Sequence, residues 1–137
     1  MKAFIDTSSL FKKYVDERGS AEFDKLFEIV NDVVVSPVTL VEIESTLAKY
    51  TRNRWITVPQ ADHLRVEIKR DYVYFSTVLW NENLEEKAIQ MVHKHALKTL
   101  DSIQLASAIL SESELFVTSD QKLYQEAKKI VKRAQFI

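Results

Sequence analysis

The sequence predicts an α/β fold in which a parallel sheet of about five strands lies between two layers of helices. Short, continuously apolar segments alternate with amphipathic segments along the chain, which is typical of strands covered on both faces. With 46% hydrophobic residues, 1 Gly and 2 Pro, the chain has enough apolar side chains for a core and no stretch typical of a linker. We therefore expect one domain over residues 1–137, with right-handed crossovers between its strands.

The first part of the chain predicts a strand and two helices. Residues 2–6 (KAFID) form a short apolar run, and the three hydroxyl residues after it suit the start of a helix that ends near Gly19. A second helix is expected over 20–30, with Ser20 as its N-cap. Its apolar stripe consists of Phe23, Leu26, Phe27 and Val30. This stripe is assigned to the core.

The middle of the chain predicts two further strands that alternate with helices. Residues 33–37 (VVVSP) predict a strand, and apolar residues at helical spacing over 38–52 predict a helix after it. A helix is also expected over 59–71. Residues 72–80 (YVYFSTVLW) are rich in β-branched and aromatic side chains, which favours a third strand.

The last part of the chain predicts three helices and two strands. They are a helix over 84–96, a helix over 99–110, a strand over 114–120, a helix over 121–131 and a short strand over 134–137. Asn83 and Glu86 have capping-box spacing and mark the start of the first of these helices.

The composition of the chain excludes several classes of function. Lys and Arg total 19 against 20 Asp and Glu, so no global positive field holds nucleic acid. The sequence has no Cys, which excludes disulfides, thiolate zinc sites and Cys nucleophiles. No run reaches the ~20 apolar residues of a membrane span, and the N-terminal run is too short for a signal peptide. We therefore expect a cytoplasmic protein.

Four acidic residues occupy equivalent positions, each where a helix begins. They are Asp6, Glu42, Asp101 and Asp120. Because the carboxyl ends of parallel strands lie at one edge of a sheet, these carboxylates are expected to meet there. Like charges at short range repel each other unless a cation compensates them. Oxygen ligands without Cys select hard ions, so the expected cofactor is Mg²⁺, or alternatively Mn²⁺.

Helix capping is the alternative explanation for each acid taken singly. Thr39 with Glu42 and Thr118 with Gln121 have capping-box spacing, and an acid in a first helical turn contributes about 0.3 to 1 kcal/mol through the helix dipole. The chain has enough Ser and Thr residues to cap its helices, however. Four acids in equivalent positions therefore exceed what capping requires.

These motifs resemble those of a known family. The segments FIDTSSL, TLVEIESTL, LDSIQLASAIL and LFVTSDQKL are similar in order and spacing to the four acidic motifs of PIN-domain ribonucleases, in the form found in VapC-type toxins of toxin–antitoxin pairs. The resemblance spans nearly the whole chain, but residues 51–95 match no motif. It implies a PIN-like three-layer sandwich and a Mg²⁺- or Mn²⁺-dependent endoribonuclease.

The resemblance also implies the site residues. The acids implied as catalytic and metal-binding are Asp6, Glu42, Asp101 and Asp120. Ser8 and Thr118 match the polar positions that support this site. Glu44 is the alternative to Glu42, but because it is two residues further along a helix it faces about the other way.

Basic residues interleaved with aromatic residues predict contacts with single-stranded RNA, for which a solvated helix end is the alternative explanation. They are Lys12, Lys13, Lys49, Arg52 and Arg54, near Tyr50 and Trp55. The resemblance further implies a small antitoxin protein that inhibits the nuclease, and a homodimer. Phe11, Tyr14 and Phe23 would fit either the core or such an interface.

Two other classes of function were compared with the nuclease. A non-catalytic module of the same fold, with an acidic edge that holds an ion, stays open, although such a module would normally have lost one of the acids. A phosphatase with an aspartyl nucleophile would have a second Asp two residues after Asp6, where this chain has Ser8.

Overall fold

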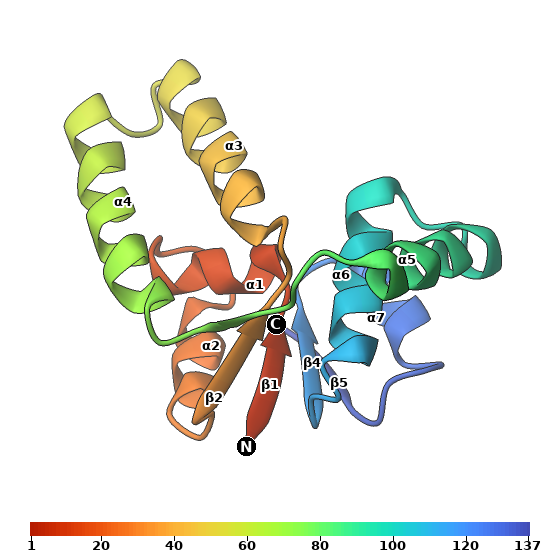
Figure 1. Ribbon diagram of the computed structural model, residues 1–137. Coiled ribbons are helices and arrows are strands. Elements are labelled where there is room, and N and C mark those ends of the chain that lie inside the picture. The colour runs from red at the N-terminus through yellow and green to blue at the C-terminus, as the bar shows by residue number, and fades with distance from the viewer.

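The computed structural model describes residues 1–137 and confirms the predicted α/β class. A sheet of five parallel strands, in the order β3-β2-β1-β4-β5, forms the centre of the molecule (Figure 1). The strands are β1 (Lys2–Ile5), β2 (Asp32–Val35), β3 (Ser76–Thr77), β4 (Leu115–Thr118) and β5 (Ala134–Phe136).

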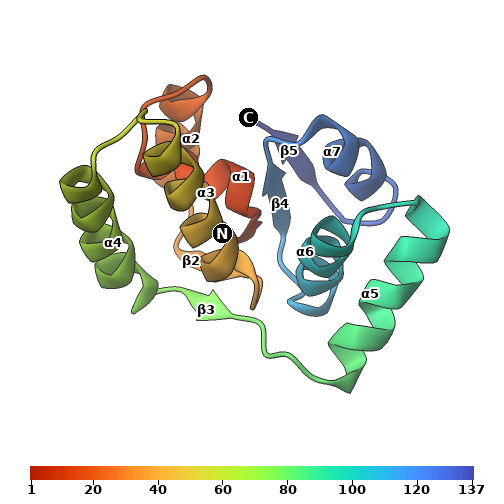
Figure 2. The same ribbon diagram turned by 90° about the horizontal axis from the view of Figure 1, so that it is seen from above.

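Helices cover both faces of the sheet, as Figures 1 and 2 show. The helices are α1 (Thr7–Leu10), the 3₁₀ helix η1 (Phe11–Lys13), α2 (Ser20–Phe27), α3 (Thr39–Arg52), α4 (Val58–Tyr72), α5 (Glu82–His95), α6 (Thr99–Leu110) and α7 (Gln121–Ala127). Helices α1 to α4 share one core cluster, and α5 to α7 share the other. None of the helices is long and apolar enough to cross a membrane.

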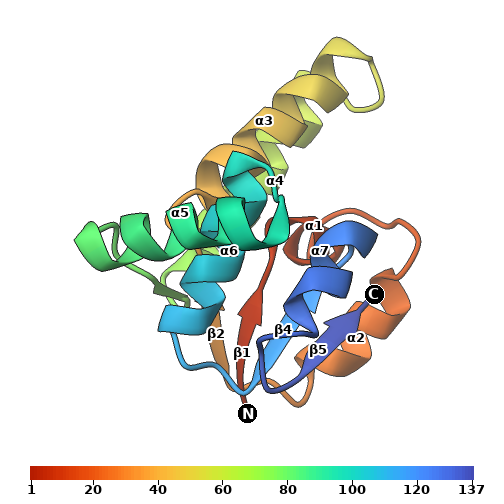
Figure 3. The same ribbon diagram turned by 90° about the vertical axis from the view of Figure 1, so that its right-hand side faces the viewer.

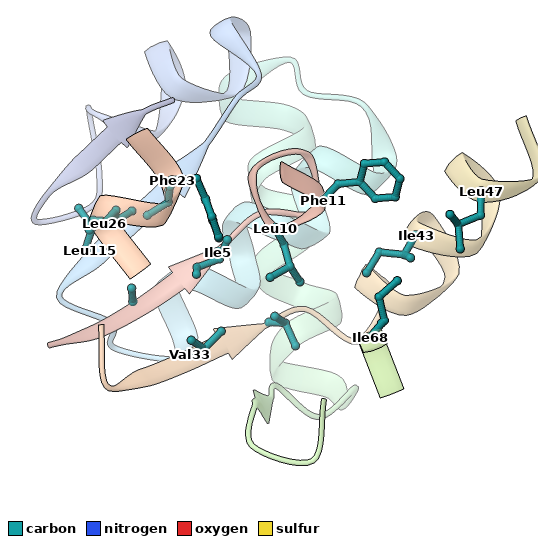
Figure 4. Close-up of a cluster of buried hydrophobic side chains, with 13 residues drawn as sticks. Ile5, Leu10, Phe11, Phe23, Leu26, Val33, Ile43, Leu47, Ile68 and Leu115 are labelled. Atoms are coloured by element: carbon teal, nitrogen blue, oxygen red, sulfur yellow. The ribbon is translucent and has the colours of Figure 1, made fainter. Parts of the chain in front are cut away.

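The central strand β1 divides its side chains between the two cores with the period of two that a strand requires. Ala3 and Ile5 pack into the cluster of α1 to α4, part of which is drawn in Figure 4. Phe4 packs into the cluster of α5 to α7, where its ring stacks on Phe116 of β4 at 5.9 Å between centroids. Phe11 and Phe23 are also fully or nearly fully buried in the first cluster, so they belong to the core.

Helices α3 and α4 form a hairpin that projects from the body of the domain beyond the carboxyl ends of the strands (Figures 1 and 3). Arg65 of α4 contacts Glu44 of α3 through Nε, at 2.9 and 3.1 Å from the two carboxylate oxygens. Helix α3 reaches the main core through Ile43 and Leu47, with Tyr50 packed against that core, whereas residues 52–55 are exposed. The base of the hairpin is therefore fixed, and its tip is exposed.

The structure corrects several predicted boundaries. The strand expected over 72–80 is only Ser76–Thr77, because α4 continues to Tyr72 and residues 73–75 form the turn that follows it. The helix expected to end near Gly19 stops at Lys13, and Gly19 itself is the N-cap of α2 in place of Ser20.

The N-cap predicted for α5 is also wrong. Helix α5 begins two residues earlier than expected, and its cap is Asn81, whose side chain accepts a hydrogen bond of 3.0 Å from the amide of Leu84. Asn83 lies inside the first turn and is exposed.

We predict that Asn81→Ala destabilises the protein by about 1 kcal/mol, because the first turn of α5 loses its capping acceptor. Urea unfolding measures the change. Asn83→Ala is the matched control and should change the stability by less than about half of that. Equal effects of the two substitutions would contradict the assignment of the cap.

Candidate active site

The four predicted acids come together at the carboxyl edge of the sheet from four different elements. Asp6 directly follows β1, and Asp120 precedes α7 after β4. Glu42 and Asp101 lie in the first turns of α3 and α6. The negative charges of Glu42 and Asp101 act on Asp6, and those of Asp120 and Glu42 act on Asp101. The four acids therefore lie near one another at this edge, although no three of them are arranged to hold a metal ion.

Asp6 is the buried centre of this group, with 4% of its surface exposed. Its Oδ2 accepts hydrogen bonds from Ser8 Oγ at 2.5 Å and from Thr118 Oγ1 at 2.9 Å. Burial raises the pKa of Asp6 to about 6, although the two hydroxyl donors favour the charged form and lower it. Ser8 and Thr118 thus contact the acid that they were predicted to support.

Glu42 is held by side chains from two other helices. Its Oε1 accepts a hydrogen bond from Thr7 Oγ1 of α1 at 3.0 Å and one from Gln104 Nε2 of α6 at 2.6 Å. Helix α3 has Val38 as its N-cap without a side-chain cap, so the alternative explanation of Glu42 as part of a capping box with Thr39 does not hold. Glu42 is used for contacts with other helices instead.

Gln104 was not identified from the sequence as a site residue. It is completely buried, although it is the only amide side chain in a helix of apolar, hydroxyl and acidic residues. An isolated amide on the buried helix that carries Asp101 was the signal available in the sequence, because buried polar groups require partners.

Asp120 and Asp101 differ in what holds them. Asp120 is the N-cap of α7 and accepts a hydrogen bond of 2.7 Å from the amide of Leu123, so it does act as a cap. Asp101 is not the cap of α6, since Lys98 occupies that position. Burial, followed by the charges of Asp120 and Glu42, raises the pKa of Asp101.

The acids fit a hard divalent cation in donor type and charge, but they do not form a closed ligand set. No group of three or more His, Cys, Asp or Glu side chains is arranged so that it could hold a metal ion. Protein donors already contact the carboxylates of Asp6, Glu42 and Asp120, and each of these carboxylates keeps further lone pairs.

A pocket of about 640 Å³ opens beside the acids, between α1, α3 and the start of α6. Its walls include the hydroxyl groups of Thr7, Ser8 and Ser119 and the rings of Phe11 and Tyr50. Of the four acids only Glu42 lines it. The pocket therefore offers a mixed polar and aromatic surface, and its charged residues are Lys12, Glu17 and Glu42.

The sequence of residues 3–129 matches the family model described as PIN domain. The chain belongs to the PIN-domain family. A comparison with curated proteins finds no match. The match includes residues 51–95, for which the motifs gave no alignment.

Solved structures with the same fold include proteins of toxin–antitoxin systems. A toxin–antitoxin complex from Klebsiella pneumoniae is 19% identical, with a TM-score of 0.69 over 98% of this chain and 97% of that one. FitAcB from Neisseria gonorrhoeae is 14% identical, with a TM-score of 0.72 over 97% and 96%. VapC20 from Mycobacterium tuberculosis, described as a Sarcin-Ricin loop cleaving toxin, is 15% identical, with a TM-score of 0.69 over 96% and 98%. At these identities the likeness establishes the fold alone.

The structure separates the predicted basic residues of this PIN domain into two groups. Lys12 is buried and its Nζ donates to Glu17 and to the carbonyl of Arg18, while Lys13 Nζ donates to Asp71 at 2.7 Å. Both ammonium groups have partners within the fold, and Lys12 also lines the pocket, so RNA contacts by these two lysines stay a prediction.

The remaining basic residues are exposed at the tip of the α3–α4 hairpin. They are Lys49, Arg52 and Arg54. Lys49 Nζ lies 6.0 Å from the centre of the Trp55 ring, which is 62% exposed. Arg52 lies about 15 Å from Glu42 along the axis of α3, at about 1.5 Å per residue. Glu44 faces away from the acids and pairs with Arg65, as its helical spacing predicted.

We predict that Asp6→Asn changes the pH dependence of stability in the metal-free PIN domain. The pKa of Asp6 is about 6 in the folded protein, whereas an aspartate without the surrounding fold has a pKa of 3.8. The folded state therefore binds the carboxyl proton of Asp6 more tightly than the unfolded state does. The resulting stabilisation is present below pH 4 and is lost as the pH rises to 6. Asparagine has no proton to lose, so the variant does not show this decrease. The unfolding free energy of the variant minus that of wild type should therefore increase by roughly 3 kcal/mol or less between pH 4 and pH 8.

Urea unfolding at several pH values with EDTA measures this shift. Asp16→Asn, at an exposed position, controls for the loss of one negative charge. A stability difference between Asp6→Asn and wild type that is the same at pH 4 and pH 8 would show that folding does not raise the pKa of Asp6.

Proposed function

We propose that this PIN domain is a metal-dependent endoribonuclease that hydrolyses phosphodiester bonds of RNA and is the toxin of a toxin–antitoxin pair. The observation that carries the proposal is the convergence of Asp6 and Asp101 with Glu42 and Asp120 beside an open pocket. Burying mutually repelling carboxylates reduces stability, which points to a functional reason for keeping them.

The acids of the proposed site would differ in how they bind a cation. Asp6 and Asp101 would bind a cation directly, and Glu42 and Asp120 would bind it directly or through water. When bound, Mg²⁺ or Mn²⁺ lowers the pKa of water and offsets the negative charge of the phosphate. Glu42 lines the pocket and would orient the attacking water toward a phosphate placed there. Ser8 and Thr118 would keep Asp6 in its orientation.

Exposed basic and aromatic groups at the hairpin tip would bind the RNA strand further from the reaction. Lys49, Arg52 and Arg54 would contact phosphates, and the exposed ring of Trp55 would stack on a base. The toxin–antitoxin assemblies among the similar structures support a small antitoxin as partner. A homodimer and a cytoplasmic location remain part of this proposal.

A non-catalytic binding module of the same fold is the second candidate. The observation that favours it is the lack of a closed set of three metal-binding side chains. Such a module would bind RNA or a basic partner without cutting.

We predict that purified protein cleaves end-labelled single-stranded RNA with Mg²⁺ or Mn²⁺ and that EDTA abolishes the cleavage. Asp6→Asn and Asp101→Asn should reduce the rate by at least about a hundredfold, on the order of 2.7 kcal/mol in the barrier. Glu42→Gln should also reduce it, while Glu44→Gln, two residues away on the other side of α3, should retain the wild-type rate.

Circular dichroism establishes that each variant is folded before its rate is compared. Binding of RNA without cleavage by the wild type would favour the non-catalytic module. Equal cleavage by wild type and the Asp6 and Asp101 variants would place the activity outside this site.

A further inference from the structure

The side chain of Gln104 joins the helix that carries Asp101 to the helix that carries Glu42. Gln104 lies three residues after Asp101 in α6, so both side chains point to the same side of that helix. Its Nε2 is 2.6 Å from Glu42 Oε1 and 2.8 Å from Thr7 Oγ1. Thr39 Oγ1, at the start of α3, lies 3.4 Å away. One amide nitrogen thus contacts polar atoms of α1 and α3.

The partners of Gln104 fix the orientation of its amide group. The NH₂ group has two protons, one for the Glu42 carboxylate and one for Thr7. Turning the amide by 180° would place its oxygen against a carboxylate oxygen, which is repulsive. The Gln104 Oε1 atom has no hydrogen-bond partner although it is buried. Leaving a buried carbonyl unpaired is unfavourable, so the contact of the NH₂ group with Glu42 must outweigh it.

The hydrogen bonds to Glu42 are unevenly distributed over its carboxylate. Thr7 and Gln104 both donate to Oε1, and Glu42 also lines the pocket. A carboxylate is planar and its two oxygens have a fixed spacing, so hydrogen bonds that hold one oxygen also restrict the position of the other. Gln104 and Thr7 therefore determine where Glu42 presents its remaining lone pairs.

We propose that Gln104 is a positioning residue that holds Glu42 for binding of the cation and its water, and that it couples Glu42 to Asp101 through α6. This inference rests on the proposed nuclease function. Groups that hydrogen-bond to metal-binding side chains typically contribute 10- to 100-fold to metal affinity or activity. Gln104 is completely buried, so it touches no substrate itself and acts through its partners Glu42 and Thr7, which line the pocket.

The test compares Gln104→Met, which keeps the size but loses both donors, with Ser107→Ala. Ser107 is equally buried, lies one turn further along α6, and its Oγ has no partner. Thr7→Val removes the other donor to Glu42 and serves as a second variant if Gln104→Met unfolds. Measured quantities are the Mn²⁺ dissociation constant by calorimetry, kcat and KM for RNA, and the side-chain amide resonances of Gln104 by NMR.

Gln104→Met should weaken Mn²⁺ binding by roughly 10- to 100-fold and lower kcat by a similar factor with KM unchanged, while Ser107→Ala leaves all three as in wild type. The Gln104 amide resonances should move in Glu42→Ala and stay in Glu44→Ala. In the Glu42→Gln background, Gln104→Met should have no further effect on kcat, because both act through one carboxylate.

Unchanged Mn²⁺ affinity in folded Gln104→Met would overturn the inference. Gln104 amide resonances that do not shift in Glu42→Ala would overturn it as well. A wild type that binds Mn²⁺ but cuts no RNA would contradict the proposed nuclease alone, because affinity and resonances still test Gln104. A wild type that binds no Mn²⁺ would overturn both.

Discussion

The structure depends on one buried carboxylate, that of Asp6, at the carboxyl end of the central strand. Its amide continues the sheet by donating to Val117 of β4 at 2.9 Å, and its side chain accepts from Ser8 and Thr118. Because β1 lies between β2 and β4, an acid directly after it is surrounded by the ends of other elements. Burial here raises the pKa of Asp6 and creates a demand for positive charge.

A network of uncharged hydroxyl and amide groups partly stabilises the carboxylate of Asp6 by hydrogen bonds. Ser8 Oγ accepts from the amide of Ser119, and Thr118 Oγ1 accepts from the amide of Asp120. The same hydroxyl groups donate to Asp6. These contacts connect the loop after β4 to the loop after β1, so the acids of both loops keep a fixed relation. These neutral donors bond Oδ2 of Asp6 but leave its negative charge, so the site still favours a cation.

Much of this arrangement could be predicted from the sequence, because it follows from periodicity and topology. Continuous apolar runs identified β1, β2 and β4, and parallel strands necessarily end at one edge. The separation of Glu42 from Glu44 followed from helical geometry, since they lie about 200° apart around α3. The edge strand β3 was overestimated because local β-propensity does not reveal how far a preceding helix extends.

The partners of the acids could not be predicted, since they depend on how helices pack. Gln104 reaches Glu42 across 62 positions of the chain, and Lys12 is buried by contacts that form only after folding. Capping explains Asp120 but not Glu42, and neither of the two capping-box spacings in the sequence, Thr39 with Glu42 and Thr118 with Gln121, marks the N-cap that the structure has. Spacing alone does not distinguish an acid that caps its own helix from one held by a neighbouring helix.

The most direct test of the central claim is anomalous diffraction from crystals grown with saturating Mn²⁺. We expect a manganese peak at the carboxyl edge of the sheet, in contact with Asp6 and Asp101. Crystals in which this edge binds no manganese, with both carboxylates still held by protein donors or water, would contradict it.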